Sequence, residues 1–232
     1  MRYPTRIIAL LAVCSLGAAC SHNSTGSNGE LSATANDSIG DTFGTAGLKQ
    51  WDISSMKFDR DTGGVTITLA FTSSIILPTT GDTTAVIGEV DMDVDQSTLT
   101  GDTSLVDYYR PGAGFTGLGV DYVLDLFDLN ADSTAPVFNV ATVTQTGLVK
   151  VVVSGKTLSA RIPRTMLGDD DGYMNAAAIV GTTNEPTDIV PNNGHLHLGG
   201  TGADIVGADR VGPTAVPGPN ARRWPARVRL PH

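Results

Sequence analysis

The sequence predicts an all-β protein, folded as an antiparallel, jelly-roll-like β-sandwich of about eight strands. Between residues 36 and 200, apolar and polar residues alternate with the period of two that is typical of strands with one buried face. Threonine and valine are abundant in this region, and no segment has the 3.6-residue period of an amphipathic helix. These roughly 165 residues are enough for one domain with its own core.

The individual strands follow from this alternation. At 65–71, valine, isoleucine, leucine and phenylalanine alternate with threonine and alanine, and a second alternation spans 86–94. Turn-forming residues such as Asp61-Thr62-Gly63-Gly64 and Asp170-Asp171-Gly172 separate the segments. Further strands are expected at 120–126, 137–143, 148–153, 158–162 and 176–180. A single helical turn is predicted at 164–167.

The N-terminus has the features of an export signal. Arg2 and Arg6 precede the uncharged apolar run 7–19, whose 13 residues are too few to span a bilayer, which needs about 20. The run ends in small residues directly before Cys20, and this ending resembles a bacterial lipoprotein signal. The resemblance implies that residues 1–19 are removed and that Cys20 becomes an acylated (palmitate-bearing) N-terminus in the outer membrane, facing the periplasm or the cell surface. Gly17 stands where leucine is usual, so ordinary signal-peptidase cleavage is the alternative.

Two segments flank the predicted domain. Residues 20–35 are small and polar, and we expect a flexible linker between the lipid and the sandwich. Residues 201–232 contain five arginines, five prolines and no regular period, and we expect a disordered basic tail. We therefore predict four regions: the signal 1–19, the linker 20–35, the sandwich 36–200 and the tail 201–232.

Composition excludes several functions. The only cysteines are Cys14 and Cys20, so after cleavage the chain has no disulfide, no cysteine-ligated zinc and no cysteine nucleophile. Residues 36–200 carry 21 acidic and 8 basic side chains. Such an acidic domain is poorly suited to nucleic acid, which needs a basic face, and well suited to collecting cations.

A ladder of acids is the sharpest candidate site. Glu89, Asp91, Asp93 and Asp95 alternate along one predicted strand and therefore project to the same side. Their mutual repulsion would be relieved by a hard cation with oxygen ligands such as Ca²⁺. Gln96 replaces the required glycine of an EF-hand, which excludes that motif, and we expect a calcium site that uses Asp91, Asp93, Asp95 and Asp102. The alternative is a solvated acidic strand end.

Two weaker candidates come later in the chain. Asp128, Asn130 and Asp132 have a D-x-N-x-D spacing that could hold calcium, although such residues are also common in turns. His195 and His197 would share a strand face and could chelate zinc or copper, but two histidines on an exposed terminal strand are more often surface residues.

Several motifs together resemble a known kind of module. They are Asn36–Gly44 followed by Trp51–Ile53, the run Val90–Gln96 ending in Thr100-Gly101, Gly119-Val120-Asp121-Tyr122, Ile162-Pro163 before Leu167-Gly168, and Asp188–Asn192. This set resembles the family 9-like carbohydrate-binding and DOMON-like sandwiches of bacterial extracellular proteins, over about residues 36–198. The resemblance implies a β-sandwich whose first strand lies in the opening motif, and a glycan or another surface ligand.

Three functions remain open on the sequence alone. We expect a lipid-anchored, non-catalytic binding module with structural calcium, whose partners are the membrane and a glycan but no nucleic acid. The alternatives are a purely structural or assembly lipoprotein without a small ligand, and a small hydrolase. We predict no catalytic residue, because no nucleophile elbow or histidine–acid–serine order is present. Trp51, Tyr108, Tyr109, Phe115 and Tyr173 are the aromatic candidates for sugar stacking.

Overall fold

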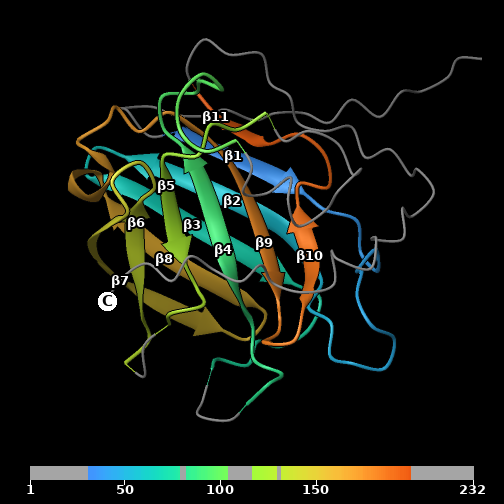
Figure 1. The fold of residues 1–232 in the computed structure, drawn as a ribbon. Coiled ribbons are helices and arrows are strands. Elements are labelled where there is room, and N and C mark those ends of the chain that lie inside the picture. The colour runs from blue at the N-terminus through green and yellow to red at the C-terminus, as the bar shows by residue number, and fades with distance from the viewer. Residues whose placement is uncertain (1–30, 79–81, 104–116, 130–131, 200–232) are drawn as a thin grey trace, which may run out of the picture.

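The structure is a computed structural model that describes residues 31–78, 82–103, 117–129 and 132–199. Within these ranges, every strand pairing is antiparallel and the strands form two facing layers (Figure 1). The predicted all-β, antiparallel sandwich is confirmed. The described residues contain eleven strands, more than the eight or so that the alternation indicated.

The strands and the one helical turn have the following bounds: β1 (Leu31–Asn36), β2 (Ile53–Asp61), β3 (Gly64–Phe71), β4 (Ile87–Asp93), β5 (Tyr122–Asp125), β6 (Thr134–Asn139), β7 (Thr144–Ser154), β8 (Thr157–Pro163), the 3₁₀ turn η1 (Arg164–Leu167), β9 (Met174–Gly181), β10 (Pro186–Val190) and β11 (Leu196–Leu198). The turn predicted at 164–167 is therefore confirmed.

The strand order explains how the two layers are joined. Along the sheet it is β1-β2-β3-β8-β7-β6-β5-β4-β9-β10, with β11 on β9. One layer contains β1, β2, β3 and β8, and the other contains β4, β5, β6, β9, β10 and β11. β7 belongs to both, because its first part pairs with β6 and its last residues pair with β8. At the open edge of the sandwich, β1 lies beside β11 and β10 contacts β2 of the other layer (Figure 1).

The start of the domain differs from the prediction. Leu31–Asn36 was expected to belong mostly to the linker, but it is β1 and pairs with β2 over its whole length. Conversely, residues 37–50 contain no strand, so the opening motif does not provide the first strand that the resemblance implied. Only Ala35 of β1 is buried, which explains why hydrophobic alternation could not reveal a strand that is held by its backbone pairing.

The core lies between the two layers. In β3 the apolar residues of the predicted alternation, Val65, Ile67, Leu69 and Phe71, are all buried in it. Trp51 is fully buried and contacts the Phe71 ring edge to face, with ring centroids 5.8 Å apart. A second, smaller apolar cluster covers the other side of the β4–β5–β9–β10 layer; it comprises Leu118, Val120, Val123, Ala177, Ile179 and Ile189.

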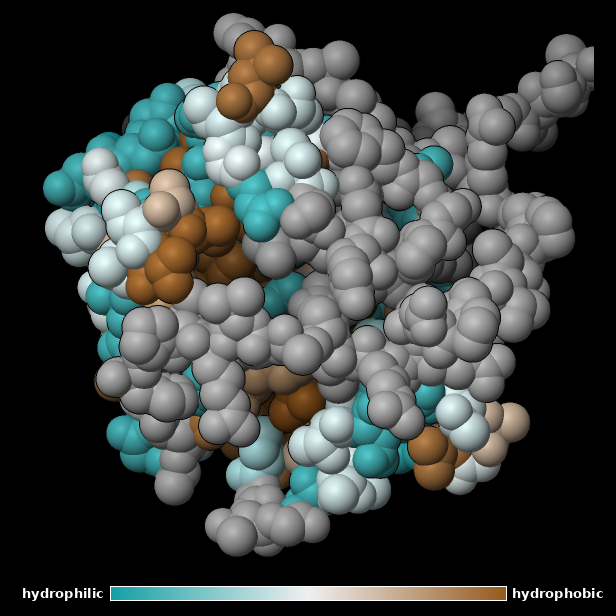
Figure 2. Space-filling view, in the orientation of Figure 1, coloured by the Kyte–Doolittle hydropathy of each residue, from teal (hydrophilic) through white to brown (hydrophobic). Residues whose placement is uncertain are grey.

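The described surface is mixed in character. Figure 2 shows the described hydrophobic residues of one face in separate groups, between hydrophilic ones. Two large aliphatic side chains stand far out of the surface: Leu99 is 95% exposed and Ile39 is 74% exposed. Both belong to the loops that carry the acidic groups described next.

Candidate metal centres

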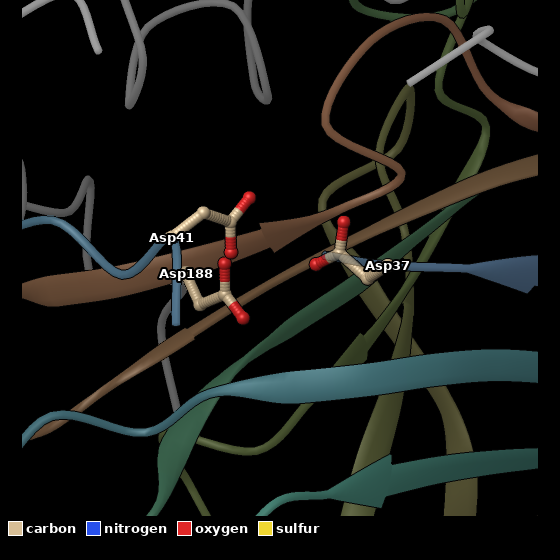
Figure 3. A group of neighbouring side chains, drawn as sticks. All are labelled: Asp37, Asp41 and Asp188. Atoms are coloured by element: carbon tan, nitrogen blue, oxygen red, sulfur yellow. The ribbon is translucent and has the colours of Figure 1, made fainter. Parts of the chain in front are cut away.

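The first group of acids, here called the edge site, consists of Asp37, Asp41 and Asp188. One carboxylate oxygen from each lies within 4.8 Å of the other two; in Figure 3 the carboxyl groups of Asp41 and Asp188 are adjacent, and that of Asp37 lies to one side of them. Asp37 directly follows β1, Asp41 lies in the loop after it, and Asp188 is in the middle of β10. The edge site therefore lies where the segment after β1 contacts β10, at the open edge of the sandwich.

Asp188 is the buried member of the edge site. It is 1% exposed, and its two oxygens accept hydrogen bonds from the backbone amides of Ile53 (2.6 Å) and Ile189 (2.9 Å). Burial, followed by the charges of Asp37 and Asp41, raises the pKa of Asp188 well above its usual value. A bound cation would favour the ionised form of this carboxyl group.

Asn192 lies against the other two members. Its Nδ2 donates to Asp37 Oδ1 and to Asp41 Oδ2, each at 2.5 Å. Asn192 follows β10 by two residues, so the same segment supplies Asp188 and the amide. The Asn192 amide thus partly compensates the charges of Asp37 and Asp41, and its oxygen would face a cation only with the amide reversed.

The second group, here called the loop site, consists of Asp93, Asp95 and Asp121. Their ligand oxygens also lie within 4.8 Å of one another. Asp93 is the last residue of β4, Asp95 is in the loop that follows, and Asp121 directly precedes β5. β4 and β5 are neighbours, and Met92 pairs with Tyr122, so the pairing itself places Asp93 beside Asp121.

Backbone and hydroxyl donors hold the loop site in shape. Asp93 accepts from the amides of Ser97 (3.1 Å) and Gly119 (3.2 Å). Asp95 Oδ2 accepts from the Thr100 hydroxyl at 2.7 Å, and Asp121 Oδ2 accepts from the amide of Val94 at 3.0 Å. Each carboxylate is oriented by a donor outside the group, as in preorganised metal sites.

Gly119 allows this close arrangement. A Cβ at that position would lie 2.1 Å from the Thr100 carbonyl oxygen and 2.2 Å from that of Ser97. Both contacts are to backbone atoms and are far below van der Waals distance, so a side chain would displace the acidic loop.

The acids of the loop site are unfavourably placed as bare charges. Burial, followed by the charges of Asp95 and Asp93, raises the pKa of Asp121 to about 6. Burial and the charge of Asp95 also raise the pKa of Asp93. Both effects would be reversed by a cation between the carboxylates.

The predicted acidic ladder is only partly brought together. Asp93 and Asp95 lie in the loop site, whereas Asp91 and Asp102 do not belong to either group. Asp91 is two residues further back along β4, and the backbone of Asp102 forms a bridge with Val120. The sequence does not predict Asp121 as a ligand, because the adjacency of β4 and β5 cannot be read from it.

The alternative of a solvated strand end is wrong for most of the ladder. Glu89 is 3% exposed, and Asp91 and Asp93 are fully buried, while Asp95 is exposed. Buried carboxylates are costly unless they are compensated. The ladder is therefore a structured feature of the described face rather than a merely hydrated edge.

The weaker calcium candidate, Asp128, Asn130 and Asp132, stays a prediction. Asn130 lies outside the described residues. Asp132 Oδ1 accepts from the Thr134 amide (3.0 Å) and hydroxyl (2.6 Å), a local arrangement typical of a turn. Asp128 is not a member of the groups formed by the described acids.

The histidines are not where the sequence placed them. His195 is 5% exposed and His197 is 8% exposed, so both are buried rather than at the surface. Neither belongs to a potential metal group among the described residues. Instead, His197 Nδ1 lies 2.8 Å from Asn175 Oδ1.

The two acidic groups have the oxygen ligands that a hard cation would require. Each offers three carboxylates, and oxygen-only ligands of variable geometry suit Ca²⁺ better than zinc or copper, which favour nitrogen and sulfur.

In the described part of the chain, no helix is long and apolar enough to cross a membrane. No protein-family model matches the sequence, and no curated protein matches it either.

Proposed function

We propose that this chain is an exported, lipid-anchored, non-catalytic β-sandwich module whose fold is stabilised by bound calcium. The observation that carries the calcium part is the convergence of three carboxylates in each of two places, with at least one member of each group fully or almost fully buried. Acids held this close disfavour the ionised state, and a divalent cation would turn that repulsion into binding energy.

The positions of the two groups support a structural role for the ion. The edge site joins the segment after β1 to β10, and the loop site joins the end of β4 to the start of β5. An ion in either place would connect segments that are distant in sequence, and would therefore stabilise the folded chain and not the unfolded one.

Calorimetric titration and thermal melting test the calcium proposal. Calcium chloride added to the full chain, purified in detergent and freed of metal, should raise the melting temperature by several degrees, and a chelator should reverse the shift. A ligand that binds only the folded state stabilises by about 2.7 kcal/mol at one hundred times its dissociation constant. A melting curve that calcium leaves unchanged, together with no heat of binding, would refute the proposal.

The lipid anchor rests on the sequence around Cys20, which lies outside the described residues. We propose that Cys20 is the acylated N-terminus and that Ser21 permits delivery to the outer membrane. More than one acyl chain would give stable attachment. Metabolic labelling with a fatty-acid analogue should mark the protein, and Cys20→Ser should abolish the label. Unlabelled wild-type protein in the medium would contradict the anchor.

Glycan binding is the ligand that the family resemblance suggests. Of the aromatic candidates, Trp51 is part of the core, and Tyr108, Tyr109 and Phe115 lie outside the described residues. Tyr173 is partly exposed, with the Arg60 guanidinium 4.8 Å from its ring centroid. Binding to a glycan array that Tyr173→Ala weakens would support this ligand; binding that is absent with calcium present would favour the purely structural lipoprotein.

A further inference from the structure

A row of three polar side chains runs across the sheet from the loop site to the last strand. Asp93 on β4 is the cross-strand partner of Asn175 on β9, and Asn175 is the partner of His197 on β11. Directly opposite residues project to the same face of a sheet, so the three side chains lie side by side. All are buried: Asp93 is 0%, Asn175 5% and His197 8% exposed. We call these residues the polar row.

Hydrogen bonds within the polar row fix the direction of the Asn175 amide. His197 Nδ1 lies 2.8 Å from Asn175 Oδ1, which can only accept, so Nδ1 carries the hydrogen and donates it. The opposite end of the amide, Nδ2, then faces Asp93 Oδ2 at 3.5 Å. If the amide were reversed, its oxygen would face the carboxylate. The imidazole of His197 therefore keeps the Nδ2 donor of Asn175 aimed at Asp93.

Gln96 makes a second connection between the loop site and β11. It follows Asp95 directly, and its φ of 55° is in the left-handed region, which is unusual for a residue other than glycine. This backbone places its Nε2 at 2.9 Å from the Gly199 carbonyl oxygen and at 3.4 Å from Asn175 Oδ1, and it donates to both. An unusual backbone conformation that persists because of such contacts points to a functional constraint.

From this geometry, and resting on the calcium binding proposed above, we infer that Asn175 and His197 are positioning residues for Asp93 as a metal ligand. His197 fixes Asn175, and Asn175 orients the Asp93 carboxylate toward Asp95 and Asp121. Hydrogen-bonded partners of this kind hold ligands in the geometry that the ion requires. The short strand β11 is thereby part of the metal centre.

Variants of His197 separate positioning from packing. In asparagine, Nδ2 stands at the place of the imidazole Nδ1, so His197→Asn keeps the donor to Asn175, whereas glutamine carries its amide one carbon further and leucine has none. Removal of such an outer partner typically weakens metal binding by about 10- to 100-fold. We expect at least a tenfold weaker calcium affinity in His197→Gln and His197→Leu, and an affinity within about threefold of wild type in His197→Asn.

The experiment is a calorimetric titration of calcium chloride into the metal-free full chain, with Asp121→Asn identifying the heat that belongs to the loop site. Leu196→Ala is the matched control, since Leu196 is the buried core-facing neighbour of His197 on β11. It should lower the melting temperature and leave the loop-site affinity unchanged. No binding by the wild type would refute the proposed function. Wild-type binding with equal affinity in His197→Gln and His197→Leu, or an equal loss in Leu196→Ala, would overturn only the positioning role.

Discussion

Asp188 and Ile53 are joined across the two layers of the sandwich by a hydrogen bond from the Ile53 amide to Asp188 Oδ2, 2.6 Å long. Ile53 is the first residue of β2 in one layer, and Asp188 is in β10 of the other. Thr187, next to Asp188 on β10, adds to the connection. The Thr187 hydroxyl accepts from the Trp51 amide and donates to the Trp51 carbonyl, each at 2.9 Å. Side chains of β10 therefore provide hydrogen-bond partners for backbone groups at the start of β2 and just before it, in the other layer.

This contact also determines the chemistry of the edge site. A carboxylate that serves as an acceptor for a buried amide cannot turn away to water, so Asp188 stays beside Asp37 and Asp41 despite their like charges. The hydrogen bonds from Ile53 and Ile189 offset part of that repulsion. Asp188 thus both links the two layers of the sandwich and belongs to the candidate cation site.

Asp93→Asn should change stability with opposite sign in the presence and absence of calcium. Without calcium the substitution should stabilise slightly, by about 0.5–1 kcal/mol, because it removes a buried charge beside Asp95. With calcium it should destabilise, because a ligand charge is lost. Urea unfolding with and without calcium measures both.

Asp171→Asn is the control for that comparison. It removes one charge from a loop outside both acidic groups, and the asparagine oxygen can still accept from the Tyr173 amide as Asp171 does. It should leave the calcium effect as in the wild type. The same sign for Asp93→Asn under both conditions would show that the loop site holds no ion.

Stability in calcium-free buffer should fall as the pH rises from about 4 to about 6. Asp121 has a folded-state pKa of about 6, above its ordinary value of 3.8, so in this window the folded chain binds more protons than the unfolded one. The raised pKa values of Asp93 and Asp188 act in the same direction. The contribution of Asp121 is on the order of 1 kcal/mol once solvent screening of this partly exposed group is allowed for.

Calcium should remove this trend and show a larger stabilising effect at pH 7.5 than at pH 5, because protons compete with the ion for the same oxygens. Denaturant unfolding at a series of pH values, with and without calcium, measures how the free energy of unfolding depends on pH and on the ion. A stability that rises with pH across this window in calcium-free buffer would mean that the acidic groups are compensated by other charges.

Asn192→Asp should make the edge site dependent on a cation. It removes the amide that donates to Asp37 and Asp41 and places a fourth carboxylate beside them. Without calcium we expect a loss of about 1–3 kcal/mol, with partial recovery when calcium is added. Asn193→Asp adds the same charge at the next, exposed position and should have little effect. Thermal melting of both variants tests this, and equal melting temperatures would contradict it.

Gly119→Ala should disrupt the loop site through the backbone. The new Cβ would overlap the carbonyl oxygens of Ser97 and Thr100, which should cost about 1–3 kcal/mol and abolish most of the calcium effect at this site. Gly155→Ala is the control, since it has open space around the new Cβ although its φ is +60°. That variant should lose about 1 kcal/mol and keep the calcium effect. A Gly119→Ala variant with wild-type calcium affinity would show that the acidic loop tolerates displacement.

The local pattern was sufficient for much of the fold. The alternation at 65–71 identified β3 and its buried face, and the short segment at 164–167 is the 3₁₀ turn. Both depend on a period within a few residues, which the sequence displays directly. The period of two also placed Glu89, Asp91 and Asp93 on one face, but it could not tell whether that face is buried, since burial depends on what lies over the sheet.

The sequence alone therefore predicts the class of the fold, the position of its clearest strands and the presence of closely spaced acids. The tertiary structure alone decided which acids meet. Asp37 and Asp188, about 150 residues apart, are brought together because the segment after β1 contacts β10 at the open edge of the sandwich. Asp121 reaches Asp93, and His197 reaches it through Asn175, because of strand pairings. Local propensity determines where the strands lie in the sequence. Pairing and burial over the whole chain determine which strands become neighbours, and a metal centre needs ligands from neighbouring strands.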